Sequence, residues 1–230
     1  MTPSPIYTGF GKFLTDNPSA ALFHADTRAI AKKNGVSIYI GKGRSVNYSG
    51  YRFGGLFDDV NKKLSVAVGG SSVPEWLGTY VHESCHMDQW LENSEVWVDS
   101  LEDDYALQDR FFSGESVPKD DIINAIGNIA VLEADCEIRS IEKIRKYNLP
   151  INQDTYTQLA NGYLFFHTAM LYYRDWYKIQ HAPSLMGVTK GMSNKFHDPE
   201  FYRCSNVLKT KFNPAIYAPC FPEKNIQELI

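Results

Sequence analysis

His82, Glu83 and His86 are the residues whose types and spacing most clearly suggest chemistry, and they form the pattern His-Glu-x-x-His. On a helix, residues four positions apart lie on one face, so the two imidazoles can bind the same metal ion. Glu83 lies beside that pair and can take a proton from a water held by the metal. In a chain with six histidines, this pattern arises by chance with a frequency on the order of 10⁻². We therefore predict a zinc site with Glu83 as general base; the alternative is a helix with two incidental histidines.

The third zinc ligand is expected on a second helix, predicted over residues 119–147. A catalytic zinc takes three protein ligands and leaves one position open for water. The apolar stripe of this helix passes through Glu133 and Glu137, and buried carboxylates are costly unless they are paired or bound to metal. We predict Glu133 as the third ligand and Glu137 as the acceptor of a hydrogen bond from a ligand imidazole, although the two roles could be exchanged. The stripe consists of Ile122, Ile126, Ile129, Ala130, Ile141 and Ile144.

Other residues beside these motifs have weaker claims to the metal. Asp135 points about 160° away from the midline between Glu133 and Glu137. Thiolates can bind zinc, and Cys85 and Cys136 lie within or beside the motifs, but Cys85 is rotated by about 100° from the ligand face and is interpreted as packing. A salt bridge is the alternative role of Glu133, and a structural role is the alternative for Glu137. The candidate partners of Glu133 are Arg139, Arg145 and Arg174.

A third helix, predicted over residues 153–180, offers groups that could assist hydrolysis. Tyr163, His167 and Arg174 recur at roughly helical spacing and share a face. A hydrolytic metal site needs a hydrogen-bond donor for the negative charge that develops on the substrate oxygen. We predict His167 and Tyr163 as catalytic groups; the alternative is that this aromatic helix only packs in the core.

These side chains require an α+β scaffold. Short β-branched and aromatic runs predict strands at residues 36–40, 48–57 and 64–68, which we expect to form a small antiparallel sheet. The His-Glu-x-x-His helix, predicted over residues 74–91, follows the last of these strands. A zinc peptidase uses this arrangement to lay an extended substrate beside its metal.

The two ends of the chain are expected to be less regular. Prolines and glycines interrupt residues 1–20, which we expect to form an irregular arm before a helix over residues 19–34. Residues 95–112 should hold a further helix or a long structured loop. The tail over residues 182–230 is rich in proline but also in aromatic residues, so we expect it to wrap over a single domain spanning residues 1–230.

Composition excludes some classes of function. The 230 residues are 43% hydrophobic and carry a net charge of −4, so a folded core is expected and neither nucleic acid nor an anionic membrane is a favoured partner. No apolar run approaches the ~20 residues that span a bilayer, and the N-terminus lacks the pattern of a secretory signal. We expect a cytoplasmic protein in a reducing compartment; Cys204 and Cys220 could pair in an oxidising one.

The residues quoted above resemble a known family. His-Glu-Ser-Cys-His, followed by a helix with Glu-Ala-Asp-Cys-Glu, is similar to the zincin metallopeptidases, and more narrowly to gluzincins, in which a glutamate on a second helix completes the zinc site. The resemblance implies a zincin-like fold, one zinc per chain, and Glu133 and Glu137 as the acidic pair. The family more often has aspartate at the second position. Residues 64–180 are also similar to small proteins of tailed phages that carry only a peptidase label, which would place this chain in a host cytoplasm.

We therefore expect a zinc-dependent metallopeptidase that hydrolyses peptide or protein substrates. A second hypothesis is a catalytically silent scaffold that binds metal and interacts with a virion or host partner, with the tail plugging the cleft. A third is a non-haem di-iron oxidase, because Glu83-x-x-His86 matches half of that signature. The second Glu-x-x-His that such an oxidase needs does not occur in the sequence. The sequence indicates no substrate preference or oligomeric state.

Overall fold

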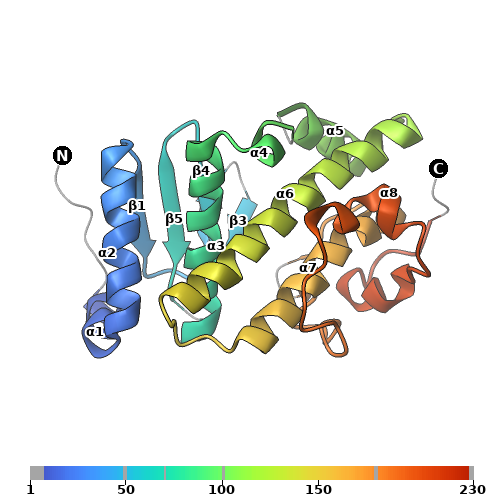
Figure 1. The fold of residues 1–230 in the computed structure, drawn as a ribbon. Coiled ribbons are helices and arrows are strands. Elements are labelled where there is room, and N and C mark those ends of the chain that lie inside the picture. The colour runs from blue at the N-terminus through green and yellow to red at the C-terminus, as the bar shows by residue number, and fades with distance from the viewer. Residues whose placement is uncertain (1–7, 49–50, 70, 100–101, 179–180, 228–230) are drawn as a thin grey trace. The chain divides into compact units, whose positions relative to one another are not determined.

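The computed structural model describes residues 8–48, 51–69, 71–99, 102–178 and 181–227. The chain divides into two compact units, and each is described by itself (Figure 1). The first comprises Met1–Glu92 and Arg139–Asn152, and the second comprises Asn93–Ile138 and Gln153–Ile230. Helices and a small sheet make the class α+β, as expected. The zincin-like fold and the single domain stay predictions.

The sheet of the first unit is mixed, so the prediction of an antiparallel sheet is wrong in part. Its strand order is β1 (Ser37–Gly41), β5 (Lys63–Ala67) and β4 (Gly55–Asp58). β4 pairs with β5 antiparallel, whereas β1 pairs with β5 parallel. β2 (Val46–Tyr48) and β3 (Tyr51–Phe53) form a separate two-stranded antiparallel sheet.

The order of the strands explains the parallel pair. A tight turn joins β4 to β5: the N–H and side-chain amide of Asn61 donate to the carboxylate of Asp58, and Lys62 adopts a φ of 50°. This turn fixes the antiparallel pairing of β4 with β5. β1 pairs with the opposite side of β5 and runs parallel to it. β5 is therefore the central strand of this sheet, and β1 and β4 are its edge strands.

Two helices precede the sheet, and one of them was not predicted. α1 (Thr8–Asp16) lies where an irregular arm was expected, while residues 1–7 lie outside the described residues. α1 forms because Phe10 is buried and packs edge-on against the rings of His24 and Trp76, so tertiary packing outweighs two unfavourable glycines. α2 (Pro18–Lys33) agrees with the predicted helix.

α3 (Val73–Glu92) carries the His-Glu-x-x-His motif, as predicted, and packs against β4 and β5. The last turns of α6 (Lys119–Lys146) belong to the same unit and contact α3. The Ser140 hydroxyl lies 3.5 Å from the Cys85 sulfur. The Lys143 ammonium lies 2.6 Å from the Asp88 carboxylate and donates to the Ser84 carbonyl oxygen at 3.1 Å. These contacts fix the register of α6 on α3.

The second unit consists of helices and turns. α4 (Glu95–Asp99) and α5 (Glu102–Phe112) precede the long α6, and α7 (Gln153–Tyr173) follows it. The predicted helix over residues 153–180 is too long, because the chain leaves α7 at Arg174, which has a φ of 47°. The Arg174 guanidinium donates to the carbonyl oxygens of Phe111, in the last turn of α5, and of Glu115, just beyond α5. This contact gives Arg174 a structural role.

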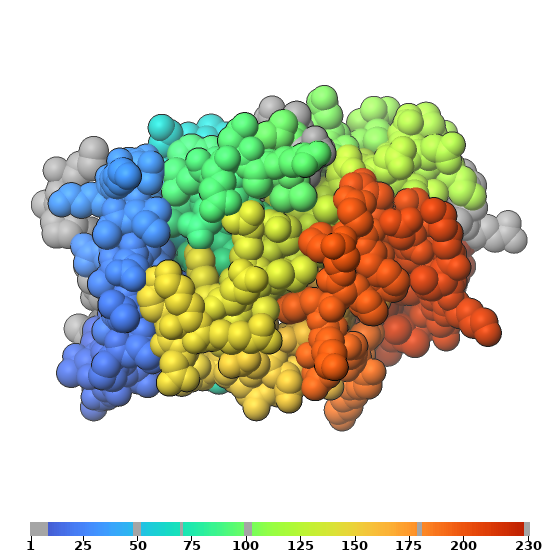
Figure 2. All heavy atoms as spheres, viewed as in Figure 1, coloured from blue at the N-terminus to red at the C-terminus, as the bar shows by residue number. Residues whose placement is uncertain are grey.

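The C-terminal tail is mostly turns and packs on α7. That it wraps over a single domain stays a prediction. It contains η2 (Pro199–Tyr202), α8 (Cys204–Val207) and η3 (Pro214–Cys220). The Tyr217 hydroxyl donates to the Gly162 carbonyl oxygen at 2.8 Å, and the Phe221 ring stacks on the Tyr173 ring. In Figure 2 the orange and red atoms of this tail form a continuous surface on the second unit.

The four cysteines are buried free thiols, so Cys204 and Cys220 are not joined in this structure. Burial raises the pKa of Cys204 to about 12 and that of Cys220 to about 11. Within the described residues, no helix is long and apolar enough to cross a membrane.

Candidate metal centre

His82 and His86 lie one turn apart on α3 and present their Nε2 atoms to each other at 3.1 Å. The rings are nearly perpendicular, with an interplanar angle of 88°. Two imidazole nitrogens bound to one tetrahedral zinc at about 2.0–2.1 Å would be separated by about 3.3 Å. The two histidines therefore already have nearly the spacing that a shared metal ion requires.

Gln89 holds the ring of His86 and was not singled out from the sequence. The side-chain oxygen of Gln89, which is fully buried, lies 2.8 Å from Nδ1 of His86. An amide oxygen only accepts hydrogen bonds, so we expect the neutral ring of His86 to carry its hydrogen on Nδ1 and to leave Nε2 as a bare electron pair. The signal that could have revealed Gln89 is its position three residues after His86, because residues three apart are neighbours on a helix.

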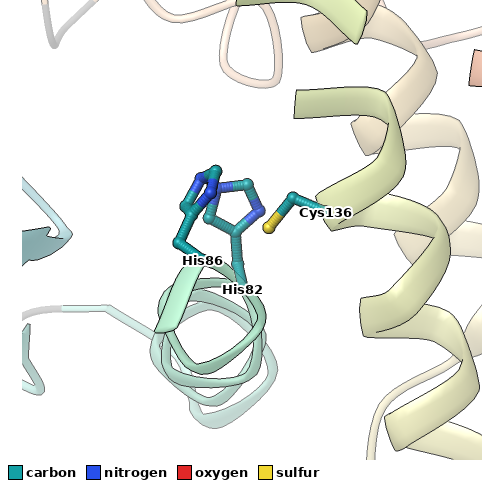
Figure 3. Close-up of side chains that lie close together, drawn as sticks. All are labelled: His82, His86 and Cys136. Atoms are coloured by element: carbon teal, nitrogen blue, oxygen red, sulfur yellow. The ribbon is translucent and has the colours of Figure 1, made fainter. Parts of the chain in front are cut away.

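Cys136, a weaker candidate in the sequence, lies close to the two histidines. The ligand atoms of His82, His86 and Cys136 all lie within 4.8 Å of one another (Figure 3). Cys136 lies on α6, one turn before Ser140. Imidazole and thiolate are both ligands of zinc. This group could therefore hold a metal ion.

Glu83 is buried against β4. Its Oε2 accepts a hydrogen bond from the Phe57 N–H at 2.9 Å. The packing is so close that a Cβ atom on Gly55 would lie 2.8 Å from Cγ of Glu83. β4 thus orients the carboxylate predicted to be the general base.

The register of β4 explains why Phe57 can reach Glu83. The Gly54 carbonyl oxygen accepts from the Ala67 N–H at 2.8 Å, and Gly55 lies opposite Val66 in the register. Because hydrogen-bonded and non-hydrogen-bonded pairs alternate in an antiparallel ladder, the backbone groups of Gly55 and Phe57 face away from β5. Glu83 therefore lies along the outer edge of the sheet.

Glu133 and Glu137 are buried in the second unit, as their place on the apolar stripe predicted. The Tyr156 hydroxyl donates to Oε2 of Glu137 at 2.5 Å. Tyr156 thus gives Glu137 a partner that the sequence did not indicate. The roles of Glu133 as zinc ligand and of Glu137 as acceptor from a ligand imidazole stay predictions.

Tyr163 and His167 lie together on α7, with ring centroids 4.9 Å apart. Burial raises the pKa of Tyr163 well above its usual value, and the charge of Glu133 adds to this effect. Burial also lowers the pKa of His167, although Glu133 and a hydrogen bond to the Tyr163 carbonyl oxygen oppose it. Both side chains are therefore neutral near pH 7, and Glu133 is close enough to influence them. Their catalytic role stays a prediction.

Comparisons with known proteins add no relative. No family model, no curated protein and no solved structure matches the chain. The chemical interpretation therefore depends on the side chains described above.

Proposed function

We propose that this protein is a zinc-dependent hydrolase of peptide bonds. The observation that carries the proposal is the pair of imidazoles on α3, whose Nε2 atoms lie 3.1 Å apart next to a buried glutamate. Two neutral imidazoles and a third ligand from a second helix form the donor set of many catalytic zinc sites. Glu83 supplies the carboxylate that such a site needs beside the metal.

The side chains of the site have distinct tasks in this proposal. Zinc, when bound, supplies a Lewis acid and lowers the pKa of a coordinated water. Glu83 accepts a proton from the attacking water and then delivers it to the leaving amine. The Phe57 N–H holds one oxygen of Glu83 in place during both transfers.

The edge of β4 supports an extended peptide as the substrate. The backbone N–H and carbonyl oxygen of Gly55 face away from β5, whereas the Phe57 N–H is already donated to Glu83. A sheet edge binds an extended chain by adding it as a further strand. Glu83 lies along this edge, so an added strand would place a peptide bond near the proposed base. We propose this edge in place of the central strand β5.

The third ligand is a choice between Cys136 and Glu133. Cys136 lies in the group of ligand atoms within 4.8 Å, whereas Glu133 is favoured by the sequence and occupies the same stripe of α6. Cobalt(II) in place of zinc distinguishes them, because a thiolate ligand adds a charge-transfer absorption in the near ultraviolet. Cys136→Ser abolishes this absorption if Cys136 binds the metal, and Glu133→Gln leaves it intact.

Glu83→Gln tests the mechanism. The variant should retain zinc and lose cleavage of a mixed library of internally quenched peptides, because it keeps the shape of Glu83 but cannot accept a proton. Cleavage by the purified variant at the parental rate would exclude Glu83 as the base.

A second candidate function follows from Cys136. If Cys136 and Glu133 both bind, the metal has four protein ligands, which is the arrangement of a closed structural site. The protein would then hold zinc firmly and cleave no peptide, and removal of the zinc would lower its thermal stability. Peptide cleavage that depends on zinc and Glu83 would exclude this candidate.

A further inference from the structure

The two ring nitrogens of His86 lie next to different kinds of atom, an amide oxygen and an imidazole nitrogen. Its Nδ1 lies 2.8 Å from the Gln89 side-chain oxygen, and its Nε2 lies 3.1 Å from Nε2 of His82. Gln89 is fully buried and His86 is 9% exposed, so bulk water does not readily replace these partners. All three residues belong to α3, and their spacing is set by one helix.

The partners determine where the hydrogen of the neutral ring resides. The Gln89 oxygen has no hydrogen to donate, so His86 must donate from Nδ1. Nε2 of the neutral His86 ring then carries no hydrogen. His86 thus has the tautomer of a metal ligand before any metal arrives.

We propose that Gln89 is a positioning residue that fixes the tautomer and ring orientation of His86 for metal binding. This inference rests on the metal site of the proposed function, but not on peptide hydrolysis. Partners that accept from the non-ligating nitrogen of a histidine commonly change metal affinity by about 10–100-fold when they are removed. Gln89 acts through His86 and does not itself touch the metal.

Two variants of Gln89 separate positioning from packing. Gln89→Met has a similar length and fills the same space but lacks the acceptor. Gln89→Glu retains an acceptor at the same place and should rescue the tautomer. The full chain is labelled with ¹⁵N, stripped of metal and kept at a pH where the histidines are neutral. Long-range ¹H–¹⁵N spectra then report which nitrogen of each ring carries hydrogen, with His86→Asn used for assignment.

The parent should show His86 with hydrogen on Nδ1, and Gln89→Glu should keep this pattern. Gln89→Met should shift His86 toward hydrogen on Nε2 and weaken zinc binding, measured by competition with a chelating dye, by about 10–100-fold. A parent protein with hydrogen on Nε2 of His86 would overturn the inference. So would a Gln89→Met protein with the parental tautomer and zinc affinity.

The same spectra test the inference even if a variant does not fold or if the proposed function is wrong. If Gln89→Met does not fold, the tautomer of the parent and of Gln89→Glu still decides whether Gln89 accepts from His86. If the proposed function fails and no peptide is cleaved, the tautomer is unaffected, because it is measured in the metal-free protein. The two failures are therefore distinguishable.

Discussion

Gly55→Ala should separate α3 from β4, and the structure gives the size of the effect. An added Cβ would lie 2.6 Å from Cγ2 of Thr79 and 2.8 Å from Cγ of Glu83. Neither atom moves away at low cost, because Thr79 is β-branched on a helix and Glu83 is tied to the Phe57 N–H. Overpacking of this kind typically costs about 1–3 kcal/mol.

The neighbouring glycine provides the control for this prediction. A Cβ on Gly54 would come no closer than 3.7 Å to Thr79, which is ordinary van der Waals contact. Gly54→Ala should therefore have nearly the stability of the parent. In Gly55→Ala, a second change of Thr79→Ser removes the nearest atom and should restore part of the loss, since the contact with Glu83 remains.

Thermal unfolding followed by circular dichroism measures the difference. A change of 1 kcal/mol shifts the melting temperature by about 2–4 °C in chains of 150–250 residues, so Gly55→Ala should melt roughly 2–12 °C below Gly54→Ala. The variant should retain zinc, because His82 and His86 are not displaced directly, but should lose cleavage as Glu83 moves. Equal melting temperatures for the two alanine variants would refute the packing of Glu83 against β4.

Three further predictions concern pH, a partly buried hydrogen bond and zinc binding. Burial, aided by the charge of Arg28, lowers the pKa of His24 to about 4 from 6.5. As the pH falls, the unfolded chain therefore takes up this proton before the folded protein does, and the free energy of unfolding should decrease between about pH 6.5 and about pH 4. Urea unfolding of His24→Gln should show a smaller decrease over the same range. An equal decrease in both proteins would contradict the lowered pKa of His24. Tyr156→Phe removes the hydrogen bond to Glu137 and should cost about 1.5–3 kcal/mol in urea unfolding, and an unchanged midpoint would count against that bond. Zinc should raise the melting temperature of the metal-free parent but not that of His86→Asn, and an equal rise in both would place the zinc elsewhere.

The helices were predictable where local signals agree with the final packing. α3 begins near Pro74, where a missing N–H is harmless, and α6 begins at an acidic first turn and carries a continuous apolar stripe. α1 was missed because Phe10 is stabilised by rings on α2 and α3, which lie far along the sequence. The direction of β1 was missed for the same reason, since a short apolar strand does not specify its partner.

The candidate site was predictable only in its local part. His82, Glu83 and His86 follow from helical spacing, and the burial of Glu133 and Glu137 follows from the stripe of α6. Gln89 and Tyr156 were missed because an amide or a phenol has no distinctive pattern in the sequence, and Cys136 was only a weaker candidate beside the motifs. Their roles become visible only through the atoms that they contact.

The most direct test of the metal site is the metal content of protein purified without added metal. The parent, His86→Asn, Cys136→Ser and Glu133→Ala should be compared by inductively coupled plasma mass spectrometry. We predict about one zinc per chain in the parent, none in His86→Asn, and loss in whichever of the other two variants removes the third ligand. A parent protein without metal, a parent with two irons, or a His86→Asn protein with undiminished zinc would contradict the account.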